Sequence, residues 1–212
     1  MDPSPDRAYV LYGVPGWGSV LAEAMLAWCA APVRIEDVAG FDRDGPSRDR
    51  LLAVNPLAQV PTLVLPDGTV MTESAAIALL LSELHPEAGL APPPGAPGRA
   101  GFLRRLVWLV ANVYPTFTYG DYPERWGGGG LAAATDAHRE RLWRVFEAET
   151  GDGPWVLGDG FSALDIFVGA MTRWRPRREW FAAQCPKLAA IAARTDALPR
   201  LRPVWQRNFG AV

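Results

Sequence analysis

Short apolar runs bounded by turn residues characterise the part of the chain before position 73. Runs of this length and pattern predict β-strands. A Pro-Asp-Gly turn at 66–68 joins the last two runs, as expected for a β-hairpin. Apolar residues at helical spacing instead predict helices over 20–30 and 75–84. The strands are expected over residues 8–12, 33–38, 62–65 and 69–72.

Beyond Arg99 the apolar residues recur every three or four positions, a spacing typical of helices buried along one face. Leu103 and Leu106 begin one such helix, which Pro115 interrupts near its end. A charged segment over 131–150 with buried-type residues on one side predicts another helix. Further helices are expected from Ala163 onward, around 186–195 and around 199–208.

A proline-rich segment over residues 86–98, PEAGLAPPPGAPG, separates these two patterns. Because proline-rich chain is extended and fairly stiff, the domain boundary is placed there. Before it, the element order is β-α-β followed by β-β-α, with Pro61 ahead of the third strand. This order predicts a thioredoxin-like α/β domain over residues 1–85, and residues 99–212 are expected to form an all-α domain.

Composition narrows the class of protein. The chain has 212 residues, of which 49% are hydrophobic and 21% charged, as in an ordinary soluble globular protein. Its net charge of −2 predicts no nucleic-acid partner, because such a partner favours a basic face. No apolar run could span a bilayer and no signal peptide is recognised, so a cytoplasmic location without a membrane partner is expected. Cys29 and Cys185 match no metal or redox spacing, and no metal is predicted.

Two places near the hairpin carry candidate chemistry. Glu73 and Ser74 stand at the predicted start of the 75–84 helix. Free N–H groups and the positive end of the helix dipole make such a start an anion-binding site. Upstream, Val60-Pro61 directly precedes a strand. Proline cannot donate a hydrogen bond to a neighbouring strand, so Pro61 must lie at the first strand position or follow a cis bond. We expect the Val60-Pro61 peptide bond to be cis.

The combination NPLAQVPTL, a hairpin and then Glu-Ser resembles the glutathione transferase family. A second match is WVLGDGFSALDIF, in which Ser162 and Asp165 form a capping box that starts a core helix. The resemblance covers nearly the whole chain. It implies the fold of that family, a thioredoxin-like domain followed by an all-α domain, with glutathione as the co-substrate.

The resemblance also implies which residues bind glutathione. The backbone of Val60, before a cis Pro61, would pair with the cysteinyl part, and Glu73 and Ser74 would hold the γ-glutamyl end. Two further candidates are Gln59, for the glycyl end, and Trp17, as a wall of the pocket.

The family's reaction is thiolate attack on an electrophile, and a free thiol has a pKa near about 8.5. A hydroxyl group and a helix N-terminus next to the sulfur would lower that value. Ser19 is the first catalytic candidate, although it lies one residue later than the reactive serine or cysteine of similar proteins. Its alternative role is an ordinary N-cap for the 20–30 helix. Tyr12, at the end of the first strand, is the second candidate, with packing in the core as its alternative.

The electrophile pocket would be lined by aromatic residues with polar atoms, which suit apolar substrates with one polar handle. The candidates are Tyr114, Tyr119, Tyr122 and Trp126, and their alternative role is packing in the core or in a dimer.

The resemblance implies a homodimeric, detoxifying enzyme that conjugates glutathione to small apolar electrophiles. Glutathione-dependent isomerisation, dehalogenation or peroxide reduction at the same site are alternatives. A non-catalytic ligand carrier or interaction module with this fold is another.

Overall fold

The computed structural model describes residues 8–210. Residues 1–7, part of the stretch considered for a targeting signal, and residues 211–212, the end of the expected all-α domain, lie outside the described residues. The chain divides into two compact units, Met1–Leu90 with Asp196–Val212, and Ala91–Thr195. The division after Leu90 lies within the proline-rich segment. Asp196–Val212 groups with the first unit, whereas the sequence predicts this segment in the all-α domain.

The first unit is built on a mixed sheet with the strand order β2-β1-β3-β4. β1 and β2 are parallel, and β3 is antiparallel to β1 and to β4. This arrangement confirms the thioredoxin-like prediction, and each strand lies within a residue or so of its expected bounds. The strands are β1 (Tyr9–Gly13), β2 (Val33–Asp37), β3 (Thr62–Val64) and β4 (Val70–Met71).

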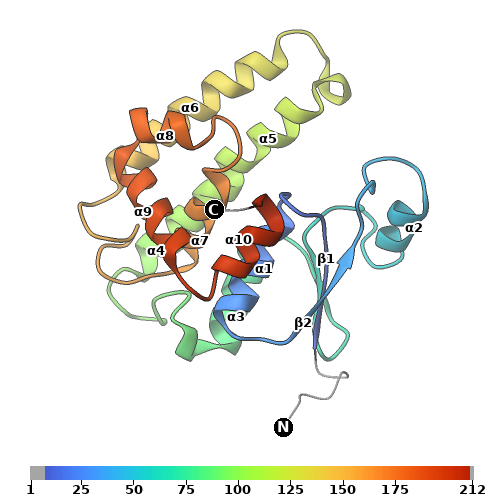
Figure 1. The fold of residues 1–212 in the computed structure, drawn as a ribbon, viewed down its shortest axis with the longest axis horizontal. Coiled ribbons are helices and arrows are strands. Elements are labelled where there is room, and N and C mark those ends of the chain that lie inside the picture. The colour runs from blue at the N-terminus through green and yellow to red at the C-terminus, as the bar shows by residue number, and fades with distance from the viewer. Residues whose placement is uncertain (1–7, 211–212) are drawn as a thin grey trace. The chain divides into compact units, whose positions relative to one another are not determined.

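Two helices, α1 (Ser19–Trp28) and α3 (Ser74–Leu84), pack against each other on one side of the sheet, and α2 (Pro46–Leu52) lies on the other (Figure 1). α1 is buried over most of its length, because apolar side chains occupy nearly every position from Val20 to Leu26. On the α2 side, a small core gathers Val38, Phe41, Leu51 and Ala58.

The C-terminal helix α10 (Arg202–Phe209) packs along α1. Trp205 is fully buried on its inner face. Asn208 is buried beside it and donates a hydrogen bond from Nδ2 to Glu23 Oε2 of α1 at 3.1 Å. These long-range contacts are the physical reason why the last segment belongs to the first unit.

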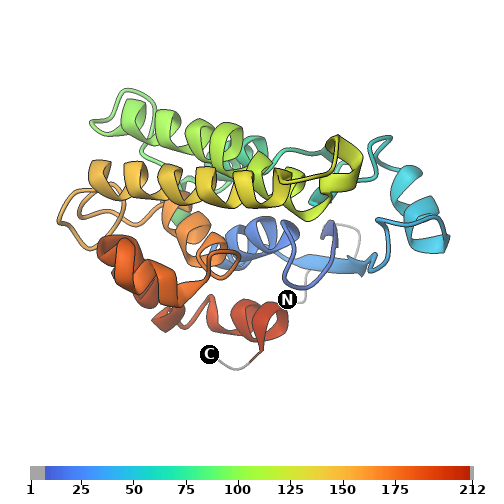
Figure 2. The same ribbon diagram turned by 90° about the horizontal axis from the view of Figure 1, so that it is seen from above.

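The second unit is helical as predicted. α6 (Leu131–Glu149) runs alongside α5 (Tyr114–Asp121) and contacts η3 (Leu109–Val113), the turn before α5 (Figure 2). α7 is buried at every position, which agrees with its expected place in the core. The short helix α8 was not predicted, because it follows a turn with few apolar residues. The elements are α4 (Arg99–Trp108), η3 (Leu109–Val113), α5 (Tyr114–Asp121), η4 (Pro123–Trp126), α6 (Leu131–Glu149), α7 (Ala163–Met171), α8 (Arg178–Gln184) and α9 (Pro186–Ala197).

Pro115 does not stop the long helix that begins at Arg99. Instead a π-helical turn, η3, separates α4 from α5, and Pro115 falls in the first turn of α5, where a missing N–H is tolerated. Carbonyl groups near this turn are bound by side chains: Asn112 Nδ2 donates to Trp108 at 3.1 Å, and Thr116 Oγ1 donates to Val113 at 2.6 Å.

The capping box at the start of α7 is confirmed. Asp165 Oδ2 accepts a hydrogen bond from Ser162 N–H at 2.7 Å, and its Oδ1 accepts one from Val156 N–H at 2.8 Å. Asp165 is fully buried, and this burial raises the pKa of its carboxyl group to about 6 despite the hydrogen bonds.

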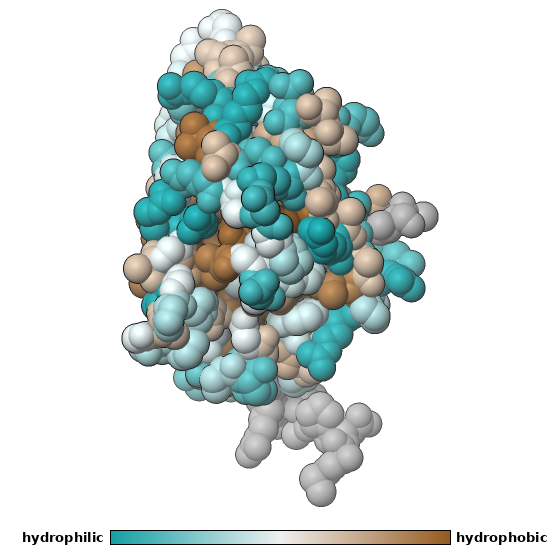
Figure 3. Space-filling model, turned by 90° about the vertical axis from the view of Figure 1, so that its left-hand side faces the viewer, coloured by the Kyte–Doolittle hydropathy of each residue, from teal (hydrophilic) through white to brown (hydrophobic). Residues whose placement is uncertain are grey.

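Within residues 8–210 no helix is both long and apolar enough to cross a membrane. Figure 3 shows that hydrophilic residues cover much of one face, with apolar residues in small patches.

Candidate functional site

The Val60-Pro61 peptide bond is cis, as expected from the sequence. The loop before it is held by Asn55, which is buried. Asn55 Nδ2 donates to Thr62 Oγ1 at 2.9 Å, and Thr62 Oγ1 donates to the Gln59 carbonyl at 2.8 Å. The role of Asn55 in shaping this loop is not predicted from the sequence. The Asn-Pro pair at 55–56, typical of turns, was the available signal.

Val60 presents its backbone without a protein partner. Among the described residues, no hydrogen bond from its N–H or to its C=O is found, although its side chain packs on the core beside α2. Half-buried backbone groups of this kind normally find a partner. An extended peptide ligand can supply one by pairing as an added strand.

The N-terminus of α3 is also uncapped. It has no acidic residue in its first turn and no side-chain cap, and the Ser74 hydroxyl has no hydrogen bond within the described part of the chain. Ser74 is nevertheless buried, at 8% exposure. Glu73, just before it, has φ 62°, a conformation that only a few per cent of non-glycine residues adopt. A carboxylate bound here would satisfy the free N–H groups.

The sheet brings these two places together. Leu63 pairs with Met71 in the antiparallel register of β3 and β4. Val60 lies three residues before Leu63, and Ser74 lies three residues after Met71. Because the two strands are antiparallel, both residues lie beyond the same end of this pair. Pro61 is buried and Glu73 is exposed, and Gln59 is exposed in the loop beside Val60. Val60, Pro61, Glu73 and Ser74 thus lie at the same end of the β3–β4 pair.

Ser19 behaves differently from the N-cap that the sequence suggested. It is the first residue of α1, and Gly18 holds the N-cap position without a side-chain hydrogen bond. The Ser19 hydroxyl accepts from Val14 N–H at 3.0 Å and donates to the Val14 carbonyl at 3.1 Å. The hydroxyl hydrogen is therefore already used within the loop over residues 14–18, named the 14–18 loop below.

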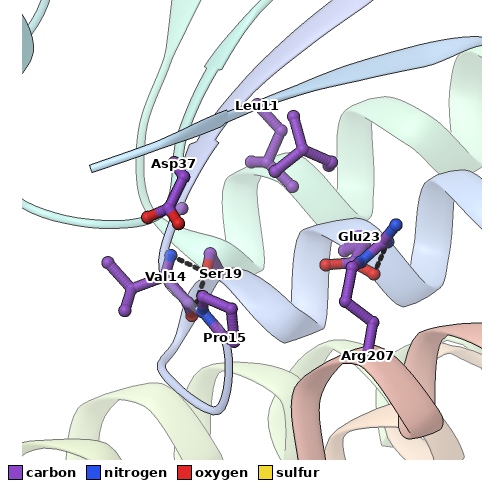
Figure 4. A pocket seen from close by; sticks show the side chains of 9 residues that line it. Leu11, Val14, Pro15, Ser19, Glu23, Asp37 and Arg207 are labelled. Carbon is purple, nitrogen blue, oxygen red and sulfur yellow. Dashed lines mark hydrogen bonds and ion pairs between the residues drawn. The ribbon is translucent and has the colours of Figure 1, made fainter. Parts of the chain in front are cut away.

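Ser19 lines a cavity of about 250 Å³ at the end of β1 (Figure 4). Apolar walls from Leu11, Val14, Pro15 and Ile35 face the charged side chains of Glu23, Asp37 and Arg207. Glu23 and Arg207 form an ion pair across it. Val60, Glu73 and Ser74 are not among the residues that line this cavity.

The backbone of the 14–18 loop lies closer to them. β1 pairs with β3 so that Tyr12 is opposite Thr62, which places the start of the loop beside Pro61. Among the described residues, no hydrogen bond from the backbone N–H of Gly18 or Ser19 is found. Two unpaired donors at the N-terminus of a ten-residue helix can stabilise an anion such as a thiolate.

Tyr12 and Trp17 both lie on the α2 side of the first unit. Tyr12 is half-buried against the core that contains Phe41, and Trp17, at 38% exposure, meets the Phe41 ring edge-on at 5.2 Å between centroids. Neither cysteine is a candidate nucleophile, because burial raises the pKa of Cys29 and Cys185 to about 12.

The aromatic candidates of the second unit form separate groups. Tyr114 packs edge-on against Trp174, at 5.9 Å between centroids. Tyr119 and Trp126 contact each other at 5.0 Å and are partly exposed, and Arg125 stacks on Tyr122 at 4.1 Å. Tyr114 is half-buried in this packing, whereas Tyr119 and Trp126 keep accessible ring surface.

Comparison with known proteins gives sequence relatives over nearly the whole chain. Residues 22–84 match the family model of the glutathione S-transferase N-terminal domain. An Escherichia coli K12 protein described as the uncharacterized GST-like protein YncG is 43% identical over 201 residues, which cover 93% of this chain and 97% of that protein.

Solved structures agree with this result. A sphingomonad glutathione S-transferase in complex with glutathione is similar with a TM-score of 0.78 and 25% identity, over 93% of this chain and 97% of that one. A glutathione transferase homologue from Sulfitobacter, with bound glutathione, reaches a TM-score of 0.82 at 24% identity, again over 93% and 97% of the two chains. Their fold extends over both units of this chain.

Proposed function

Because the chain belongs to the glutathione S-transferase family, we propose that it binds glutathione in its first unit and transfers it to a small apolar electrophile. One observation carries this proposal. Val60 and the N-terminus of α3 offer backbone donors and an acceptor that no other described residue uses, along one edge of one sheet.

Each part of the tripeptide has a matching group. The N–H and C=O of Val60 pair with the cysteinyl backbone, as in strand addition, and Pro61 holds that segment in place. The N–H and hydroxyl of Ser74 bind the γ-glutamyl carboxylate, and Glu73 binds its ammonium group. Gln59 and Trp17 flank the ligand, Gln59 toward the glycyl end.

The chemical step needs a thiolate. The glutathione thiol loses its proton to solvent, and the N–H groups of Gly18 and Ser19 stabilise the negative sulfur. The thiolate then attacks the electrophilic carbon, so that a carbon–sulfur bond forms while the leaving group departs with its electron pair. Ser19 and Tyr12 are the side-chain candidates for the same role, and the Ser19 hydroxyl would serve only after leaving the Val14 carbonyl.

The electrophile is proposed to contact Tyr119, Tyr122 and Trp126, whose rings suit an apolar molecule with a polar handle. The protein is proposed to act as a homodimer in the cytoplasm, where conjugation of reactive compounds is a detoxifying activity.

Calorimetric titration tests glutathione binding directly. Reduced glutathione and S-methylglutathione should both bind, because the second keeps every backbone and carboxylate contact and lacks only the thiol. Glutamate alone should bind much more weakly, since it cannot pair with Val60. If neither tripeptide binds, the assignment of Val60 and Ser74 is wrong.

A glutathione-binding carrier without turnover is the second candidate. One observation favours it: the Ser19 hydroxyl is engaged by Val14. The family resemblance supports it as well, because it implies that the reactive serine or cysteine of similar proteins corresponds to Trp17 or Gly18 of this chain. Binding of glutathione without turnover of aryl halides, alkyl halides, peroxides or isomerisable enones would indicate the carrier. Product analysis on the same panel separates conjugation from dehalogenation, peroxide reduction and isomerisation.

A further inference from the structure

Asn208 links the C-terminal helix to the 14–18 loop through its side-chain amide. Its Oδ1 accepts a hydrogen bond from Gly16 N–H at 3.0 Å. Its Nδ2 donates to Glu23 Oε2 at 3.1 Å and to the Val204 carbonyl at 2.9 Å. Asn208 is buried, at 8% exposure, so these bonds have little competition from water.

The loop and the helix also approach closely at the backbone. Gly16 has φ +80°, a left-handed conformation that favours glycine. A Cβ atom at this position would lie 3.2 Å from the Asn208 carbonyl oxygen. Gly16 therefore contacts Asn208 in two ways. Its N–H binds the Asn208 side chain, and its lack of a side chain allows the Asn208 carbonyl to approach.

A separate contact attaches the same helix to α1. Arg207 pairs with Glu23, whose side chain is buried and lies one turn beyond Ser19. This ion pair does not involve the 14–18 loop. The chain thus offers a matched pair of neighbours on α10: Arg207 anchors the helix, and Asn208 anchors the helix and also fixes the loop.

We propose that Asn208 is a positioning residue for the thiol step, an inference that rests on the proposed function. Asn208 holds the 14–18 loop so that the N–H groups of Gly18 and Ser19 face the glutathione sulfur. Only Trp17 separates Gly16 from Gly18, so the direction of those N–H groups depends on where Gly16 is held. A displacement of about 1 Å at a reacting group can lower a rate by about a hundredfold. The charged groups facing this region are Glu23, Asp37 and Arg207.

Three variants test the proposal: Asn208→Ala, Arg207→Ala and, as the exposed control on the same helix, Gln206→Ala. Amide hydrogen exchange across the 14–18 loop is measured first, without ligand. The affinity for S-methylglutathione is then measured by calorimetry, and the pKa of the bound glutathione thiol by ultraviolet titration of the thiolate.

Asn208→Ala should speed amide exchange at Gly16 and Trp17, whose N–H groups are hydrogen-bonded to Asn208 and Val14. It should also raise the pKa of the bound thiol by about one unit, which lowers the thiolate fraction about tenfold at a pH well below that pKa. Its affinity for S-methylglutathione should stay within about twofold, because Val60 and Ser74 make the binding contacts. Arg207→Ala should lower the melting temperature and shift the thiol pKa by less than Asn208→Ala does, because the hydrogen bond from Gly16 to Asn208 is kept. Gly16→Ala, which disturbs the same contact from the loop side, should repeat the thiol shift if Asn208→Ala does not fold.

An unchanged thiol pKa in folded Asn208→Ala, or an equal shift in Arg207→Ala, would overturn the proposal. Loop exchange that matches Gln206→Ala would overturn it as well. A wild-type protein that binds no S-methylglutathione overturns the proposed function and this role together, and it is recognised from the wild type alone, whatever the variants do.

Discussion

The hydroxyl group of Ser19 is hydrogen-bonded to both the N–H and the carbonyl of Val14. One side chain thus closes the loop that leads from β1 into α1. A Cβ atom on Gly13 would lie 2.6 Å from Ser19 Cβ, so the glycine at the end of β1 leaves room for this closure. The loop geometry therefore depends on Ser19 whether or not its hydroxyl ever reaches a sulfur atom.

Ser19→Ala is expected to lower turnover at least several-fold and to leave glutathione affinity nearly intact. Two hydrogen bonds are lost, and the unfolding free energy should fall by about 1–2 kcal/mol. Steady-state kinetics and calorimetry on the same preparation separate the two effects. Unchanged turnover in the folded variant would remove Ser19 from the catalytic candidates and leave the backbone N–H groups and Tyr12.

Ser74→Ala is expected to weaken glutathione binding by about 1.5–3 kcal/mol, because a hydrogen bond to a charged carboxylate is lost. The stability loss should be smaller, since Ser74 caps nothing in the free protein. Calorimetry measures the binding change. Ser82→Ala, near the other end of α3, is the matched control. Within residues 8–210 its hydroxyl bonds only the Leu79 carbonyl, and its loss should leave affinity unchanged.

Asp165→Asn should change how stability depends on pH. The pKa of Asp165 rises from 3.8 in the unfolded chain to about 6 in the fold, so the folded state holds the proton more tightly. Stability from this group is greatest below about pH 4 and falls as the pH rises to about 6, by about 3 kcal/mol in all. The asparagine variant lacks this slope.

Denaturant unfolding of both proteins between pH 4 and pH 8 measures the difference. The stability gap between wild type and Asp165→Asn should shrink as the pH rises through 6. A gap that stays constant or widens would mean that the hydrogen bonds from Val156 and Ser162 outweigh the burial of the carboxylate.

The proposed homodimer is testable through Val107, an apolar residue on α4 with 53% exposure. Sedimentation at micromolar concentration should give the mass of a dimer. Val107→Asp should shift it toward monomer, because a charge in an apolar interface is costly. Val145→Asp, on the 45% exposed Val145 of α6, is the control. A wild-type monomer would contradict the dimer.

Local sequence signals predicted much of the fold. The strands and helices and their order along the chain, the cis bond before Pro61 and the Ser162–Asp165 capping box each depend on residues close together in the sequence. The edge formed by Val60 and Ser74 was predictable for the same reason, since one short hairpin joins them.

Contacts between distant segments were not predictable. Gly16 and Asn208 lie 192 positions apart, and no pattern in either segment indicates that they meet. The alternative N-cap position of Ser19 is wrong, because a serine before an apolar run suits both an N-cap and the first helical turn. Which of these two positions Ser19 takes depends on where Val14 lies in the folded chain.

The π-helical turn over Leu109–Val113 sets the rotational phase of everything after it on the same helix. A residue removed from this turn would rotate α5 by about 100° about its axis and shift it by about 1.5 Å. Thr116, which now accepts hydrogen bonds from the buried Arg139 of α6 at its hydroxyl and its carbonyl, would turn away. The Nε and Nη2 atoms of Arg139 would lose these acceptors, and only the hydrogen bond from Nη1 to Asp136 would be kept. Chain length in this turn should therefore tolerate neither insertion nor deletion, even where the identity of its residues can vary.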